Sequence, residues 1–229
     1  MKKILVFVMC ASLFTATANA QTFKQAGGEK NFEVNFAPLG GSPVSIGGIK
    51  FRKFNSTGTS AMRLNVFVGT MSEKTIDQQA DTSGNPELTT KNSSFNISIR
   101  PGFEKHMAGT DRLSPYVGAE IAFTLNTSKE VAEGQNGDKS INKTTTKNTD
   151  GYTAFGANLF CGTDFYFAKN IYLGAEFGFG FNLKSMSDEK VEYSDFTPTN
   201  PANPEDVRQG STLQLGPTYI GTLRLGWLF

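Results

Sequence analysis

The sequence predicts an all-β protein: an eight-stranded antiparallel transmembrane β-barrel with an up-and-down meander. Alternation of apolar and polar residues with a period of two, which is typical of strands, recurs in eight segments separated by glycine, proline, asparagine or charge clusters. The connections between these segments alternate in length, and the chain ends on a phenylalanine. The expected strands are 30–38, 45–55, 60–69, 93–104, 114–126, 151–167, 171–183 and 212–229.

The first twenty residues have the pattern of a secretory signal peptide. Two lysines precede an apolar stretch at 4–14, and Ala18-Asn19-Ala20 forms a small-residue cleavage site. The apolar stretch is shorter than the ~20 residues that a transmembrane helix requires. We therefore expect residues 1–20 to be a signal peptide and residues 21–229 to form one barrel domain. Cys161 is then the single remaining cysteine, so no internal disulfide is expected.

The clearest expected strand is 171–183, where every odd position is apolar and the even positions are tyrosine, glycine, glutamate or asparagine. A soluble, lipocalin-like barrel with an apolar interior is the alternative to a membrane barrel. The polar faces of the expected strands are rich in glycine, which suits a crowded lumen better than a face exposed to water. These glycines are Gly118, Gly156, Gly162, Gly174, Gly178, Gly180, Gly216 and Gly226. The apolar face is therefore predicted to point outward, to lipid.

The connections support the same interpretation, because short periplasmic turns and long extracellular loops are typical of outer-membrane barrels. The short connections are 56–59 and 168–170, and 105–113 is intermediate. The long ones, 70–92, 127–150 and 184–211, are polar and are expected to be surface loops. Tyr193 and Phe196 are their only aromatic candidates for contact with an external ligand or a protein partner.

The inward parity of the expected strands collects charged residues. Five acidic residues oppose five basic ones: Glu33, Glu104, Glu120, Asp164 and Glu176 against Lys50, Arg52, Arg63, Arg100 and Arg224. A balance is needed there, because an unpaired buried charge costs several kcal/mol. Eight strands leave an interior only wide enough for side chains to fill. The sequence therefore predicts a plugged lumen with a charge network.

Two irregularities are expected in the wall. A change of parity in strand 45–55 requires a bulge at Gly47-Gly48. Pro101, Pro115 and Pro217 each remove a ladder donor, so we expect bulges or rim positions at these prolines.

No enzymatic site is predicted. His106 is the only histidine, and we expect it to be a solvated turn residue far from any strand serine or carboxylate. Cys161 has the lipid-facing parity and is expected to be inert. The acidic residues of the loops match no metal-binding spacing, so neither a metal nor a cofactor is expected. The formal net charge of +1 gives no reason to expect a nucleic acid partner.

The final strand, Leu223–Phe229, and the segment Asp164–Gly180 resemble the small outer-membrane β-barrel family common in Bacteroidota. The plan is also similar to OmpA-type and OmpX-type barrels. The resemblance implies an outer-membrane location among lipids. It also implies that Trp227 and Phe229 form a signal read by the barrel-assembly machinery. The expected function is structural, or the presentation of loops to a partner; an accessory subunit of a larger outer-membrane complex and a narrow porin-like passage are the alternatives.

Overall fold

The computed structural model describes residues 23–36, 46–217 and 222–229. The predicted signal peptide, residues 1–20, lies outside the described residues, as do parts of three expected strands at 37–38, 45 and 218–221. The described residues form one antiparallel sheet of 11 strands. Among these residues, no helix is long and apolar enough to cross a membrane.

The strands follow one another along the chain with short turns at one end. They are β1 Lys30–Phe36, β2 Ile46–Phe54, β3 Ser60–Gln78, β4 Leu88–His106, β5 Leu113–Gln135, β6 Ile141–Lys147, β7 Tyr152–Ala168, β8 Ile171–Met186, β9 Lys190–Ser194, β10 Ser211–Pro217 and β11 Thr222–Leu228. The turns 55–59, 107–112 and 169–170 share one end with the last residue, Phe229, and we call it the short-turn end. The opposite end is the extended end.

The pairing closes a ring of eight strands, which confirms the predicted fold class. The order around the ring is β1, β2, β3, β4, β5, β7, β8 and β11, and β11 pairs back to β1. Strand β10 pairs with β8 beyond β11, so β10 and β11 together correspond to the expected last strand. Strands β6 and β9 lie outside the ring and continue the sheet from β5.

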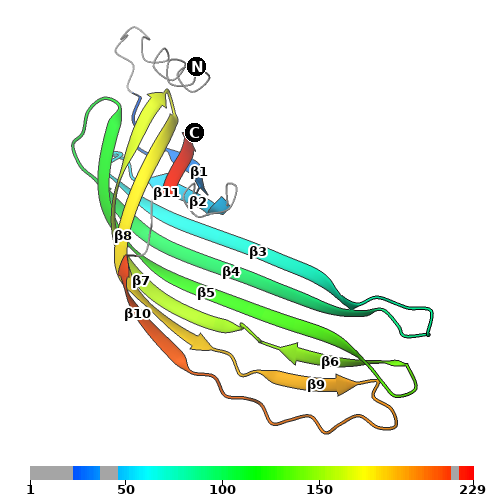
Figure 1. Cartoon of the computed structure of the whole chain (residues 1–229). Helices are drawn as coiled ribbons and strands as arrows, with labels where there is room; N and C mark the ends of the chain where they lie inside the picture. Colours follow the sequence, from blue (N-terminus) through cyan, green and yellow to red (C-terminus); the bar gives the residue numbers. More distant parts are fainter. Residues whose placement is uncertain (1–22, 37–45, 218–221) are drawn as a thin grey trace, which may run out of the picture.

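The two ends of the barrel differ in closure. Strands β3, β4 and β5 run far past β1, β2 and β11, as Figure 1 shows. Beyond Val66, the described residues of β3 pair only with β4, and those of β10 pair only with β8. The described part of the wall is therefore a full ring at the short-turn end and an open arc at the extended end.

The three long loops predicted at 70–92, 127–150 and 184–211 are wrong in large part. Strand β3 runs to Gln78 and β4 starts at Leu88, while β5, β6 and β9 fill much of the other two segments. In these stretches both faces of the sheet are polar, so no apolar alternation identifies them. Threonine-rich sequence such as Thr144-Thr145-Thr146 nevertheless favours strands. The connections left between the strands in this part of the chain are 79–87, 136–140, 148–151, 187–189 and 195–210.

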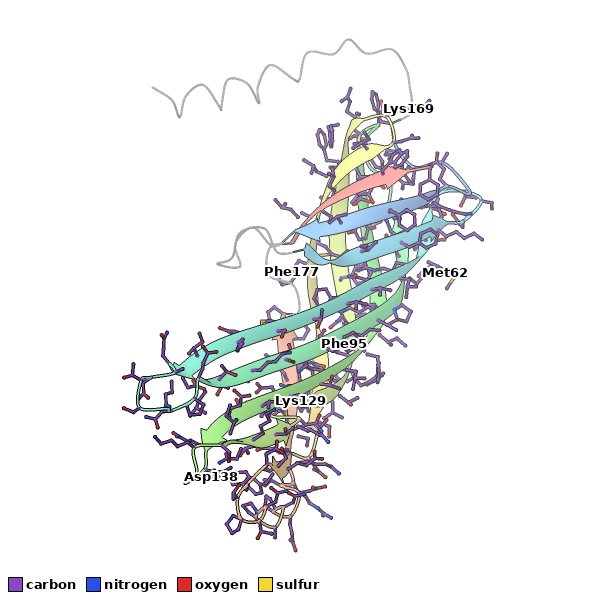
Figure 2. The ribbon with its side chains drawn as sticks, turned by 90° about the vertical axis from the view of Figure 1, so that its right-hand side faces the viewer. Met62, Phe95, Lys129, Asp138, Lys169 and Phe177 are labelled. Carbon is purple, nitrogen blue, oxygen red and sulfur yellow. The ribbon has the colours of Figure 1, made fainter. Side chains whose placement is uncertain are left out.

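The two faces of the wall separate as predicted. Met62, Leu159 and Phe177 are exposed on the outer surface, whereas the alternate residues point into the lumen and are mostly buried. In Figure 2, Met62, Phe95 and Phe177 lie along the middle of the molecule, between Lys169 at the short-turn end and Asp138 at the extended end. An apolar band of this kind is typical of a membrane-spanning barrel.

The wall irregularities are accommodated in different ways. The β1–β2 register shifts by one residue between Val34 and Phe36, opposite Gly47-Gly48, which is the predicted bulge. The expectation of a bulge or rim position at Pro101 is wrong: β4 keeps a constant register with β3 through Pro101, which lies opposite Leu64. Only ladder pairs on the β5 side, at Arg100 and Pro101, are missing. The missing N–H of Pro101 therefore interrupts the β4–β5 ladder locally but does not shift its register.

Candidate functional site in the barrel lumen

A cluster of charged side chains fills the lumen at the short-turn end. It contains nine of the ten residues predicted for the lumen, all at most 6% exposed. They are Glu33 and Arg224 from the seam strands β1 and β11, Lys50 and Arg52 from β2, Arg63 from β3, Glu104 from β4, Glu120 from β5, Asp164 from β7 and Glu176 from β8. Every strand of the ring contributes at least one charge. Inward parity is what brings them together, since each occupies a lumen-facing position of its strand.

Several ion pairs cross the lumen. Arg63 donates to Glu176 through both terminal nitrogens at 2.9 Å, and β3 and β8 lie opposite each other in the ring. Arg52 Nη2 is 2.8 Å from Asp164 Oδ2, which joins β2 to β7, another opposite pair. Bidentate guanidinium–carboxylate pairs have defined geometry as well as strength. These contacts therefore bridge the barrel across its width.

Further pairs run around the ring. Arg52 also contacts Glu33 at 2.6 Å and Glu104 at 2.8 Å, and Arg224 contacts Glu33 at 2.8 Å and Asp164 at 2.9 Å. Glu120 accepts from Arg63 at 2.9 Å. Each of these carboxylates has a cationic partner, as a buried charge requires.

Aromatic side chains, which the sequence analysis did not select, complete the packing. Tyr116 donates to Glu176 at 2.8 Å, and Tyr172 is hydrogen-bonded to Asn31 and Arg52. The Arg63 guanidinium lies 3.9 Å from the centre of the Phe160 ring. Tyrosines at inward parity, beside charged residues, are the sequence feature that could have identified them.

Residues 23–29, the described segment before β1, close the short-turn end, and we call this segment the cap. Gln25 Nε2 donates to Ser114 Oγ at 2.8 Å, and Gln25 Oε1 accepts from Tyr166 at 3.1 Å. Below it, Phe54, Tyr166, Tyr172 and other buried residues form an apolar cluster. The lumen is therefore covered by the chain itself at this end.

The expectation that His106 is a solvated turn residue is wrong. His106 is the last residue of β4 and is 6% exposed. Its Nδ1 lies 2.8 Å from Ser114 Oγ, and its Nε2 lies 3.2 Å from Glu104 Oε2. The register between β4 and β5 explains the contact, because β5 returns immediately past the turn and Tyr116 lies opposite His106. Sequence spacing alone did not reveal this proximity.

The Ser114, His106 and Glu104 side chains have the order of a nucleophile, a base and an acid, but the serine is not accessible. Ser114 is 1% exposed, and its hydroxyl contacts both Gln25 and His106. A nucleophile must lie within reach of a bound substrate. These contacts therefore link the cap to the charge cluster.

Arg100 of β4 is the tenth residue predicted for the lumen. It lines a polar cavity of about 300 Å³ nearer the extended end, together with Thr124, Asn158, Asn182 and Gln214. Its Nε donates to Ser98 Oγ at 3.4 Å. Among the described residues, the lumen is thus densely ion-paired at the short-turn end and contains a polar cavity farther toward the extended end.

The remaining candidate residues lie on the outside. Trp227 and Phe229 are exposed at the short-turn end, where the Phe229 ring stacks on Phe32 with centroids 5.5 Å apart. Tyr193 and Phe196 are half-buried at the extended end, with ring centroids 5.6 Å apart. The two aromatics thus pack on each other.

Comparison with solved structures finds a similarity to CarO2 from Acinetobacter baumannii. The match covers 90% of this chain and 100% of that chain, with 10% sequence identity and a TM-score of 0.35. No family model and no curated protein matches the chain.

Proposed function

We propose that this chain is a non-enzymatic outer-membrane β-barrel with a sealed lumen, which presents its extended end at the cell surface. The observation that carries the proposal is the set of ion pairs between opposite strands. Arg52–Asp164 and Arg63–Glu176 cross the lumen with their side chains almost fully buried. A barrel whose width is bridged in this way leaves no continuous water path.

The exposed apolar band supports the membrane part of the proposal. Residues such as Leu159 and Met62, each 70% exposed, would be costly on a surface in water but suit hydrocarbon. The signal peptide at residues 1–20 would direct export. Mass measurement of the protein from bacterial outer membranes should give a chain that begins at Gln21.

Conductance in planar bilayers tests the seal. The wild-type chain should show no large, steady conductance. Arg63→Ala combined with Glu176→Ala removes one bridge together with both charges, and it should produce measurable ion flow. Asn182→Ala, in the cavity near the extended end, serves as the matched control and should show no more conductance than the wild-type chain. Large, steady conductance of the wild-type protein would contradict the sealed lumen.

Trp227 and Phe229 are proposed as the recognition signal for the assembly machinery. Both side chains are exposed, so replacing them changes no contact of the lumen charges. Phe229→Ser keeps the two backbone hydrogen bonds between Phe229 and Lys30. It should reduce outer-membrane insertion in cells but leave refolding of the purified chain in detergent unchanged. Equal loss in both assays would instead assign Phe229 a structural role.

A further inference from the structure

The extended end carries an unusual distribution of charge over the two faces of its sheet. One face continues the lipid-facing parity of the barrel wall, and the register places six lysines on it. They are Lys74 of β3, Lys91 of β4, Lys129 of β5, Lys143 and Lys147 of β6 and Lys190 of β9. We call this set the lysine face.

The opposite face of the same strands has the reverse character. It carries Glu73 and Asp77 of β3 and Glu130 of β5, and within 71–77, 88–94, 128–134, 142–146 and 191–193 no lysine or arginine has this parity. The lysine face holds two strand carboxylates, Glu133 and Glu192. Within these five ranges, the basic side chains therefore all lie on the surface that points away from the barrel axis.

The lysines are also placed against each other. Lys129 is directly opposite Lys147, which is directly opposite Lys190, and Lys74 is opposite Lys91. Like charges directly opposite on neighbouring strands destabilise a sheet. Acidic neighbours offset part of the repulsion: Lys147 pairs with Glu192, Lys190 with Asp206 and Lys74 with Glu87. The hydrogen bond from Lys190 to Asp206 raises the pKa of Lys190, which keeps this ammonium charged.

The height of the lysine face relative to the apolar band identifies its partner. Phe95 is the last large apolar residue on the outer side of β4, and it lies opposite Thr127. Residues paired across neighbouring strands form rows on this face. The next row toward the extended end contains Ser93, Lys129, Lys147 and Lys190, and the row after it contains Lys74 and Lys91. Two residues along a strand advance it by about 7 Å. Measured along β4 and β5, the lysines thus begin one step beyond the apolar band, and Figure 2 shows Lys129 beside Phe95 on the side of the extended end.

We propose that the lysine face binds the phosphate-bearing headgroups of the lipid leaflet that surrounds the extended end. This inference rests on the proposed membrane location. Headgroup phosphates at the edge of the hydrocarbon layer would lie against the lysine face and neutralise the lysines that oppose each other on neighbouring strands. The binding would hold the barrel at a fixed depth and orient the sheet that extends from it.

The test uses the full mature chain, reconstituted in vesicles and then titrated in mixed micelles. The probes are lipid A with two phosphates and the same lipid after removal of both. Each lysine near an anionic surface contributes about a fivefold gain in affinity. The wild-type chain should prefer the phosphorylated lipid by at least about tenfold. The triple variant K91Q/K129Q/K147Q should lose most of this preference.

A matched control removes three lysines from the short-turn end, as K53Q/K105Q/K169Q, which changes the net charge equally. This control should keep the wild-type preference. Heat-modifiable gel mobility confirms that each chain is folded. Without lipid, K91Q/K129Q/K147Q should melt at the wild-type temperature or above it, because like-charge contacts have been removed.

The outcomes separate the two proposals. Equal binding of both lipids by the wild type, or an unchanged preference in K91Q/K129Q/K147Q, overturns the headgroup site while the membrane location stands. Failure of the wild-type chain to float with neutral vesicles overturns the membrane location, and the headgroup site with it.

Discussion

The two ends of this barrel use charge in opposite ways. At the short-turn end, Arg52 and Arg63 are buried among carboxylates and tie opposite strands together. At the extended end, lysines lie exposed in rows and face one another across strands. Buried charge is costly unless it is paired, so the first arrangement specifies a single packing. Exposed charge contributes little to stability, so the second arrangement is free to serve an external partner.

The largest expected effect is at Arg52. Arg52→Met leaves Glu33, Glu104 and Asp164 without their shared partner and should lower the free energy of unfolding by about 3–5 kcal/mol. Urea titration of the refolded chain in detergent micelles measures the change. Arg208→Met, at an exposed arginine near the extended end, should change it by less than about 0.5 kcal/mol. Similar losses in both variants would remove the distinction between the two ends.

An overpacking substitution comes next. A Cβ at Gly174 would lie 2.5 Å from Arg224 Nη2 and 2.8 Å from Asp164 Oδ1, so Gly174→Ala must displace an ion pair. We expect a loss of about 1–3 kcal/mol in the same titration. At Gly216 of β10, a Cβ would meet nothing within 4 Å, and Gly216→Ala should be tolerated. A stable Gly174→Ala variant would indicate that the charge cluster has room to rearrange.

A smaller effect is expected where the cap meets the charge cluster. Ser114→Ala removes the hydrogen-bonding partner of both Gln25 and His106 and should cost about 1 kcal/mol. Hydrogen exchange of residues 23–29 should increase together with this loss. Ser93→Ala, at the extended end, is the control. If exchange in 23–29 does not change, the cap is held by other contacts.

The smallest effect is expected for an exposed ion pair. A double-mutant cycle of Lys147→Gln and Glu192→Gln should give a coupling of about 0.5 kcal/mol or less, because both side chains are close to half exposed. Salt should reduce it further. A coupling above about 1 kcal/mol in high salt would mean that the extended end relies on its ion pairs as the short-turn end does.

The fold could be predicted from the sequence wherever the two faces of a strand differ. In 171–183 the apolar and polar faces alternate without exception, and the structure has β8 at Ile171–Met186. In 141–147 neither face is apolar, and the prediction of a loop was wrong because strand β6 forms there. Alternation in a sequence arises where the two faces of a strand lie in different environments. A sheet with water on both sides has no such difference, so its strands show no alternation.

The lumen residues could be selected by parity, but their partners could not. Parity places Arg63 and Glu176 inside, yet the pairing across the ring depends on the stagger between strands. The position of His106 was missed for a related reason, since its contacts with Ser114 and Glu104 follow from the β4–β5 register. Gln25 lies outside any strand, so no periodicity could identify it.

The position of Arg224 in the chain has a consequence for biosynthesis. Arg224 lies in the final strand, and its carboxylate partner Glu33 lies 191 residues earlier, in the first. A chain that stops before β11 would leave Glu33 and Asp164 with fewer cationic partners and the seam of the wall unpaired. Stable burial of the lumen charges thus depends on complete translation, so truncated chains would remain open and accessible to proteases.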